Sequence, residues 1–198
     1  TVKKTALNDF ANVRRGGIIA IKITPGDTLI EARFTTGHDD VVLVTADGQS
    51  IRFHEDGVRT MGRAAAGVRG IRLGKDDHVV ALSIVSADAT LLVAGENGIG
   101  KRTVFDDYRV QARGGKGIKT MKITKKTGKV IGGLTVHDGD EIMLITVGGQ
   151  MVRTSVSGIR QAGRNTQGVR LVNVDDKDRL QDIAPVVSAN QEEAATID

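Results

Sequence analysis

The chain has 198 residues and no cysteine, which excludes a disulfide framework and any cysteine metal site. Only 3% of the residues are aromatic, and 25 glycines beside 2 prolines indicate many tight turns. The formal charge is +4, and no apolar run reaches the ~18 residues of a membrane span, so we expect a soluble, modestly basic protein.

A repeat of about 50 residues organises the sequence. One marker of the repeat is a glycine followed by a β-branched residue, and the spacings between successive markers are 50, 50 and 51 residues. The four markers are Gly17-Ile18, Gly67-Val68, Gly117-Ile118 and Gly168-Val169. A unit of this size buries little apolar surface alone, so we expect consecutive units to stack and cover each other.

Two further series share this period. Hairpin-turn pairs recur at spacings of 50 and 51 residues, and so do basic residues that follow each turn. The turn pairs are Asp47-Gly48, Asn97-Gly98 and Gly148-Gly149. The basic series is Arg52, Arg102 and Arg153, with Lys4 as its predicted first member. The three series together place the units at about 1–40, 41–89, 90–141 and 142–187.

Each complete unit is predicted to hold four strands. In the second unit, residues 41–45 form an apolar run, a turn follows, and residues 50–54 alternate in polarity. The third and fourth strands of that unit are predicted over 68–73 and 79–85. The corresponding strands of the third unit are 91–94, 101–104, 118–123 and 130–136. The first unit lacks its first strand, so we expect an exposed edge there unless the C-terminal segment supplies a partner.

No segment has a convincing helical period, so the sequence predicts a single all-β domain over residues 1–187. Its architecture is predicted to be a propeller-like disc of about four four-stranded blades, of which the first is incomplete. Residues 188–198 are polar and are predicted to form a flexible C-terminal tail.

Positive charge is concentrated in residues 101–129, which contain ten Lys or Arg and two Asp, a net charge of +8. A clustered positive field is typical of proteins that bind a polyanion, although a solvated lysine face is the alternative.

Basic residues also recur in the loop between the second and third strands of every unit. Because the units repeat in space, we expect these side chains to line the rim of the disc, where Arg can bind phosphate bidentately. The loop residues are Arg14, Arg15, Arg59, Arg63, Arg109, Arg113, Lys116, Arg160 and Arg164. The predicted phosphate-binding set also includes Lys4, Arg52, Lys101, Arg102 and Arg153 on the preceding strands. The alternative is that each repeated Arg stabilises a turn or a strand pair.

The loop of the third unit reads Gln111-Ala112-Arg113-Gly114-Gly115-Lys116-Gly117. Its three glycines would let the backbone approach a phosphate and expose N–H donors, while Arg113 and Lys116 supply charge. The loop resembles the seven-residue box of the C-terminal domains of bacterial DNA gyrase A subunits, Gln-Arg-Arg-Gly-Gly-Lys-Gly, with Ala112 in place of Arg. The surrounding segments 61–62, 67–74, 97–103 and 163–169 also resemble blades of that domain, and the resemblance extends to about Val187.

The resemblance implies a β-pinwheel, a disc whose blades exchange strands and which wraps double-stranded DNA around its positive edge. It implies the last four of about six blades, with the altered box as a secondary DNA contact. It further implies a non-catalytic part of a cytoplasmic, nucleoid-associated bacterial topoisomerase. The implied partners are double-stranded DNA, the gyrase B subunit, and the remainder of the gyrase A subunit. We expect the isolated chain to be monomeric and to act without a membrane.

Two other functions stay open. One is the similar C-terminal domain of the topoisomerase IV A subunit, in which the box is more degraded. The other is a β-propeller scaffold whose arginines would contact an acidic protein.

No catalytic constellation is evident in the sequence. The four histidines have no metal-ligand spacing, and the glycine-rich segments do not join a strand to a helix. Tyr108, the only tyrosine, aligns with Phe10, Val58 and Ile159, so we predict a packing residue rather than a nucleophile. We therefore expect a domain without enzymatic activity, metal or cofactor.

Overall fold

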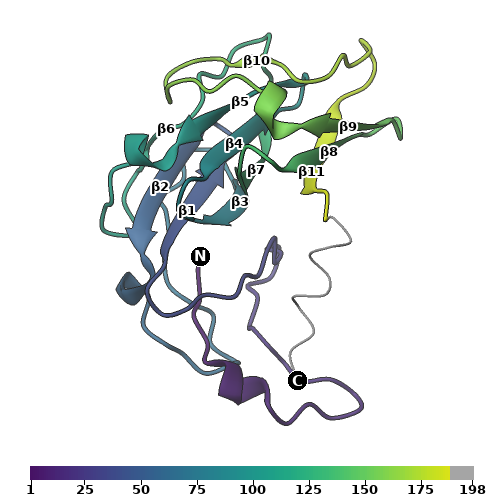
Figure 1. The fold of residues 1–198 in the computed structure, drawn as a ribbon. Coiled ribbons are helices and arrows are strands. Elements are labelled where there is room, and N and C mark those ends of the chain that lie inside the picture. Colours follow the sequence, from purple (N-terminus) through teal and green to yellow (C-terminus); the bar gives the residue numbers. More distant parts are fainter. Residues whose placement is uncertain (188–198) are drawn as a thin grey trace.

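The computed structural model describes residues 1–187 (Figure 1). Three antiparallel sheets follow one another along the chain, which confirms the all-β prediction. Residues 1–39 carry isolated bridges and one short 3-10 helix, η1 (Leu7–Phe10), and lie beneath the sheets in Figure 1. The predicted tail, residues 188–198, lies outside the described residues. Within residues 1–187 there is no helix whose length and apolar character would suit a membrane crossing.

Each of the last three units contributes three strands to its own sheet. The second unit supplies β1 (Asp40–Thr45), β2 (Gln49–His54) and β3 (Val79–Ile84). The third unit supplies β4 (Thr90–Gly95), β5 (Ile99–Val104) and β7 (Val130–Val136). The fourth unit supplies β8 (Glu141–Thr146), β9 (Met151–Ser155) and β11 (Leu180–Pro185). Apart from the third strand of each unit, the strands of the second and third units agree with the predicted ranges to within two residues.

The central strand of each of the second and third units is buried on both faces. In β1, Val42 and Val44 belong to a core shared with the third unit, whereas Val41 and Leu43 pack with Phe53 on the other face. In β4, Leu91 and Val93 face the first of these cores and Leu92 and Ala94 face the fourth unit. A continuous apolar run is therefore required, because neighbouring units cover both faces of the strand.

The third strand of a unit pairs with the preceding unit. β6 (Ile118–Lys119) pairs antiparallel with β2, and β10 (Val169–Arg170) pairs antiparallel with β5. An isolated bridge between Val2 and Val68 repeats this contact at the first junction. The sheet orders are therefore β3-β1-β2-β6, β10-β5-β4-β7 and β11-β8-β9. This arrangement confirms the strand exchange that the resemblance implied.

The predicted third strands over 68–73 and 118–123 are too long. The described strand is two residues in the third unit and one isolated bridge in the second. The ladder ends because the chain reaches the hairpin turn of the accepting strand, where Thr120 N and Met121 N both donate to Gly48 O, at 2.8 and 3.3 Å.

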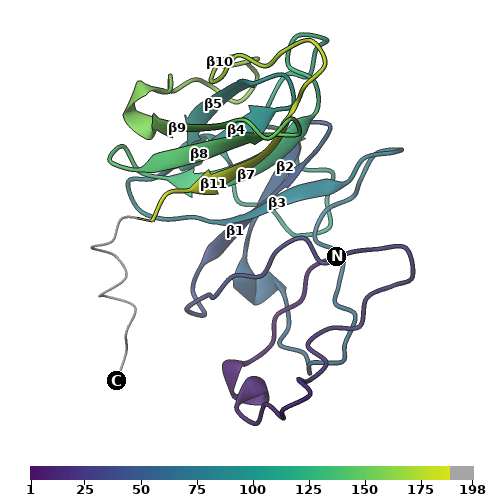
Figure 2. The same cartoon turned by 90° about the vertical axis from the view of Figure 1, so that its right-hand side faces the viewer.

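Up to residue 187, the C-terminal segment does not pair with the first unit. β11 pairs antiparallel with β8 and completes its own unit, as the side view in Figure 2 shows. The expectation that the C-terminal segment might supply a partner to the first unit is corrected for the part of the chain that ends at residue 187.

Candidate nucleic-acid interface

Basic side chains occupy three recurring positions between the end of the second strand of a unit and its third strand, the third strand included. At each position the spacing is 50 and 51 residues, so the side chains form three rows across the units. The first row is Arg59, Arg109 and Arg160, all exposed. The second row is Arg63, Arg113 and Arg164, all partly buried. The third row is Arg69, Lys119 and Arg170, all exposed.

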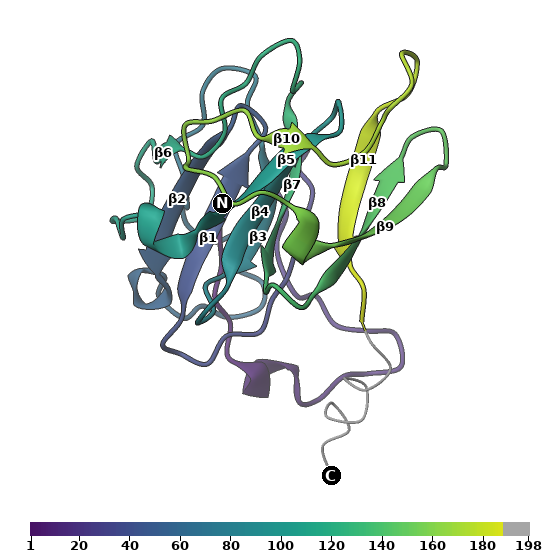
Figure 3. The ribbon, with the colours of Figure 1, turned by 45° about the horizontal axis from the view of Figure 1, so that its top comes forward.

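The third row was not among the predicted site residues. Its members follow the marker glycine by two positions, so the same period would have found them. Lys119 and Arg170 lie on β6 and β10, which are the outermost strands of their sheets (Figure 3). Because β6 and β10 pair with the preceding unit, their basic side chains lie at the edge of that unit's sheet.

Each arginine of the second row binds the backbone of the unit before it. Its Nη1 donates to the carbonyl oxygen of the third-row position, or of its equivalent in the first unit. The pairs are Arg63 to Ile19 at 2.9 Å, Arg113 to Arg69 at 3.1 Å and Arg164 to Lys119 at 2.9 Å. Arg113 Nε also donates to Gly57 O, at 2.5 Å. Each of these arginines therefore joins two units, which supports in part the alternative that the repeated arginines have a structural role.

These contacts connect the rows into one rim. The second-row guanidinium of one unit lies on the backbone of the third-row residue of the previous unit. In the first unit, Arg14 lines an open hollow together with Arg63, and the neighbouring Arg15 is exposed. Like charges held close together repel unless an anion lies against them, so the rim is electrostatically suited to a polyanion.

The box-like loop uses its backbone to contact the second unit. Gly114 N donates to Gly70 O at 2.5 Å, and Gly115 O accepts from Arg72 N at 2.8 Å. The expectation that these glycines offer N–H donors to a phosphate is therefore corrected at Gly114, whose donor is engaged. Lys116 and Ala112 are exposed, so the charge that this loop offers comes from side chains.

Gln111 begins this loop and joins it to the second unit. Gln111 N donates to Arg52 O at 2.8 Å, and its Nε2 is buried without a hydrogen-bond partner among the described residues.

The basic series on the second strands forms a regular structural contact. Parallel bridges join Lys4 to Thr60, Arg52 to Val110 and Arg102 to Gln161, which confirms Lys4 as the first member of the series. Each side chain donates to a carbonyl oxygen at the 3-10 turn of the next unit. These bonds are Lys4 to Glu55 at 3.1 Å, Arg52 to Phe105 at 2.9 Å and Arg102 to Ile159 at 2.7 Å.

The same side chains are also paired with carboxylates. Arg52 binds Asp40 at 2.7 Å, Arg102 binds Asp138, and Lys4 lies 3.5 Å from Glu55. All three side chains are engaged between units, and the prediction that Lys4, Arg52 and Arg102 bind phosphate stays a prediction. Lys101 is fully buried, so it offers no surface to a phosphate in this structure. Arg153 is exposed and paired with Glu141.

Tyr108 is a packing residue, as the alignment of the units predicted. It is 1% exposed, its ring lies 6.3 Å from that of Phe105, and its hydroxyl is 2.7 Å from Thr120 Oγ1. Burial raises the pKa of the Tyr108 phenol, which opposes formation of a phenolate. Among residues 1–187, no three His, Asp or Glu side chains converge as a metal site would require.

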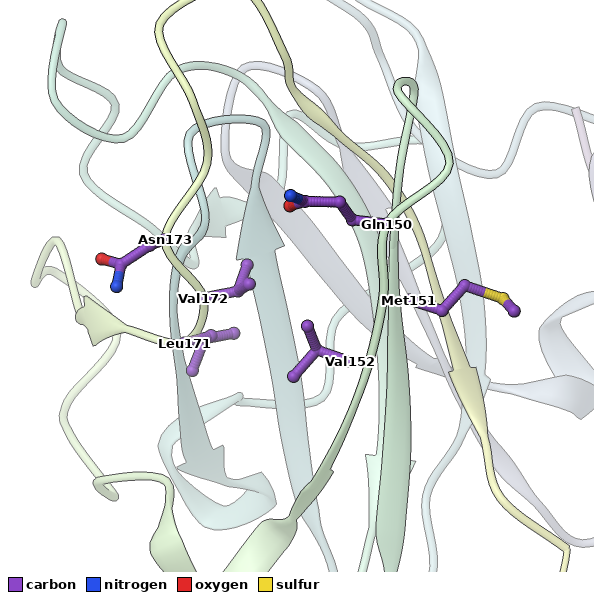
Figure 4. A pocket seen from close by; sticks show the side chains of 6 residues that line it. All are labelled: Gln150, Met151, Val152, Leu171, Val172 and Asn173. Carbon is purple, nitrogen blue, oxygen red and sulfur yellow. The ribbon is translucent and has the colours of Figure 1, made fainter.

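A hollow beside β9 also lacks reactive groups. Its lining includes Val152, Leu171 and Val172, which point toward one another, whereas Met151 points away (Figure 4). The polar side chains of the lining are the amides of Gln150 and Asn173. No lining residue can act as an acid, a base or a nucleophile.

Comparison with known proteins places the chain in a family. The family model described as DNA gyrase C-terminal domain, beta-propeller, matches residues 1–36, 39–86, 89–137 and 140–186, once in each unit. The DNA gyrase A subunit of Mycolicibacterium smegmatis is 46% identical over 196 residues, and that of Escherichia coli K12 is 44% identical over 199. These alignments cover 98% and 100% of this chain but 23% of each relative.

Solved structures agree with the sequence relatives. The structure of a DNA gyrase A C-terminal domain superposes with a TM-score of 0.81 at 27% identity, covering 87% of this chain and 59% of that one. The C-terminal domain of DNA topoisomerase IV, at 24% identity and a TM-score of 0.87, shares the fold and covers 93% of this chain and 58% of that one.

The match also supports the expectation of a non-catalytic part, because the family model is that of a C-terminal domain and the chain spans about a quarter of its relatives. The chain belongs to the DNA gyrase C-terminal domain family.

Proposed function

We propose that this chain binds double-stranded DNA through its phosphates, without sequence preference, and bends the duplex along the rim of basic rows. The observation that carries the proposal is the rim itself, where Arg and Lys recur at three positions in successive units. Membership of a gyrase family supports DNA as the polyanion.

The contacts in the proposal explain why no sequence is read. Arg and Lys side chains that bind phosphate oxygens fix the position of a duplex but carry no base information. Bending a site of 20–30 base pairs by 40–90° costs about 1–6 kcal/mol, so several phosphate contacts are needed to offset it. A rim repeated from unit to unit supplies such contacts at regular intervals.

The proposed DNA surface differs from the one predicted from sequence. It consists of the three rows with Lys116, Arg14 and Arg15, and it omits the residues engaged between units. In the intact enzyme the domain would act beside the gyrase B subunit, together with the rest of the gyrase A subunit, in the bacterial cytoplasm at the nucleoid. There it would wrap DNA and support negative supercoiling, as a monomeric module within its subunit.

A salt titration tests the proposal. Binding to a random duplex of about 40–150 base pairs is expected to weaken linearly with the logarithm of salt concentration. The double variant Arg113→Ala/Lys116→Ala removes two phosphate contacts, so its slope should be smaller by about 1–2. Lys75→Ala is the matched control, because Lys75 is exposed but lies outside the rows beside Asp76 and Asp77.

Two results would contradict the proposal. One is no binding by the unaltered chain at about 50 mM salt, where the electrostatic contribution is large. The other is an equal slope for the double variant and the unaltered chain, which would leave the rim without a role. Saturable binding to an acidic protein with no affinity for DNA would favour the scaffold function instead.

A further inference from the structure

One position on the second strands alternates between lysine and an aliphatic residue. It immediately precedes the Lys4, Arg52, Arg102 and Arg153 series. Its occupants in the four units are Lys3, Ile51, Lys101 and Val152. The fold therefore accepts an apolar side chain here, and a lysine at this position needs its own explanation.

Both lysines reach under the basic loop of the next unit. Lys101 is 0% exposed, and its Nζ donates to Gly163 O at 2.5 Å and to Arg164 O at 2.6 Å. Lys3 Nζ donates to Ala20 O at 2.7 Å and to Arg63 O. Each lysine thus binds the carbonyl of a second-row arginine.

The box-like loop has a different support. A Cβ placed on Gly115 would lie 3.7 Å from Ile51 Cδ1, so an aliphatic side chain fills the place beneath that loop. A lysine at this position and an aliphatic residue at this position both contact the loop of the next unit, but only the lysine adds a positive charge there.

The charge of Lys101 is unfavourable for folding. Burial, followed by the nearby Arg164 guanidinium, lowers its pKa to about 8, and Asp107 opposes this shift. Between that value and the ordinary value of 10.5, the unfolded chain binds more protons than the folded chain, so stability rises with pH. At neutral pH the folded chain therefore holds the ammonium less favourably, relative to the neutral amine, than the unfolded chain does.

We propose that Lys101 is a positioning residue for DNA binding, which holds the Gly163 and Arg164 carbonyls inward so that the Arg164 side chain is presented to a phosphate. The inference rests on the proposed function, since it assumes that the Arg164 loop contacts DNA. The loop is held from other sides as well, because Thr103 Oγ1 donates to Ala162 O at 2.7 Å and Thr166 Oγ1 donates to Gly163 O at 2.9 Å.

A pH dependence follows from this position. The charged groups that face Lys101 are Arg164 from the loop and Asp107 from the 3-10 helix η3 (Phe105–Asp107). A phosphate bound beside Arg164 would stabilise the ammonium, so binding would be linked to proton uptake. The affinity should therefore fall as the pH rises above about 8, by at most tenfold per pH unit for one proton.

The test compares the unaltered chain with Lys101→Met, which keeps the linear shape and removes the charge. Binding to a random duplex of about 40 base pairs is measured at fixed salt between pH 7 and 9, together with thermal unfolding. We expect Lys101→Met to bind about threefold to tenfold more weakly at pH 7, with the difference shrinking toward pH 9. Its melting temperature should be equal or higher. Val152→Leu, at the equivalent position, is expected to keep the affinity and pH profile of the unaltered chain.

The outcomes separate the inference from the proposed function. If the unaltered chain binds DNA and Lys101→Met matches it at every pH, the inference is overturned and the proposed function stands. An affinity loss that is constant from pH 7 to 9, or a lower melting temperature, would also overturn the role of the charge. No DNA binding by the unaltered chain would overturn the proposed function, and the inference with it.

Discussion

Gly117→Ala is expected to lower the free energy of unfolding by about 2–4 kcal/mol, through two effects at the same residue. Gly117 has a φ of +73°, a conformation that an alanine adopts only with strain. A Cβ at this position would also overlap the carbonyl oxygen of Ser50, which is backbone and cannot rotate away. The junction between β2 and β6 would have to open to relieve that overlap.

Thermal unfolding of the variant gives the measurement. For a domain of this size, a loss of 2–4 kcal/mol corresponds to a melting temperature lower by about 4–16 °C. Gly62→Ala is the control, since Gly62 does not have a positive φ and a Cβ there would meet no atom within 4 Å. A melting temperature within about 2 °C of the unaltered chain would show that the junction tolerates a side chain.

The same geometry explains why the marker glycine was visible in the sequence. Gly67 and Gly168 also have positive φ, and a Cβ on either would overlap a carbonyl oxygen, that of Val2 and that of Gly100. The backbone has a positive φ at this position in each unit, and glycine is the residue that adopts this conformation without strain. The repeat and the central strands could therefore be predicted, because they depend on residue types that local geometry or two-sided burial demands.

The partner of a short strand could not be predicted in the same way. Ile118 pairs with Ser50, 68 residues earlier, and the local sequence of the strand is the same whichever strand accepts it. A pattern of apolar and polar residues records which face is buried, but it does not record the neighbour. The exchange entered the prediction only through the resemblance to a family.

The contacts that several predicted site residues make within the protein could not be predicted for a related reason. The alternation along residues 50–54 placed Arg52 on the face opposite Ile51 and Phe53, but the 3-10 turn of the next unit covers that face. Lys116 and Lys101 are equally basic in sequence, and only the tertiary structure shows that one is exposed and the other fully buried.

Arg102→Ala is expected to lower the free energy of unfolding by about 2–3 kcal/mol. Arg102 is 7% exposed, and it joins Ile159 O of the fourth unit with the carboxylate of Asp138. Removing the side chain leaves a cavity and a carbonyl that loses its donor. Asp138 is largely exposed and can be solvated by water, so the loss is smaller than for a pair buried on both sides.

Arg153→Ala is the matched control, because Arg153 is the next member of the same series and is exposed. Its ion pair with Glu141 is screened by solvent, so the melting temperature should hardly change. DNA binding gives the second measurement: at a temperature where Arg102→Ala remains folded, its salt slope should equal that of the unaltered chain, because Arg102 lies between units. A smaller salt slope for Arg102→Ala would show that Arg102 contacts DNA. An equal loss of stability in Arg102→Ala and Arg153→Ala would show that burial between units does not account for the stabilising effect of Arg102.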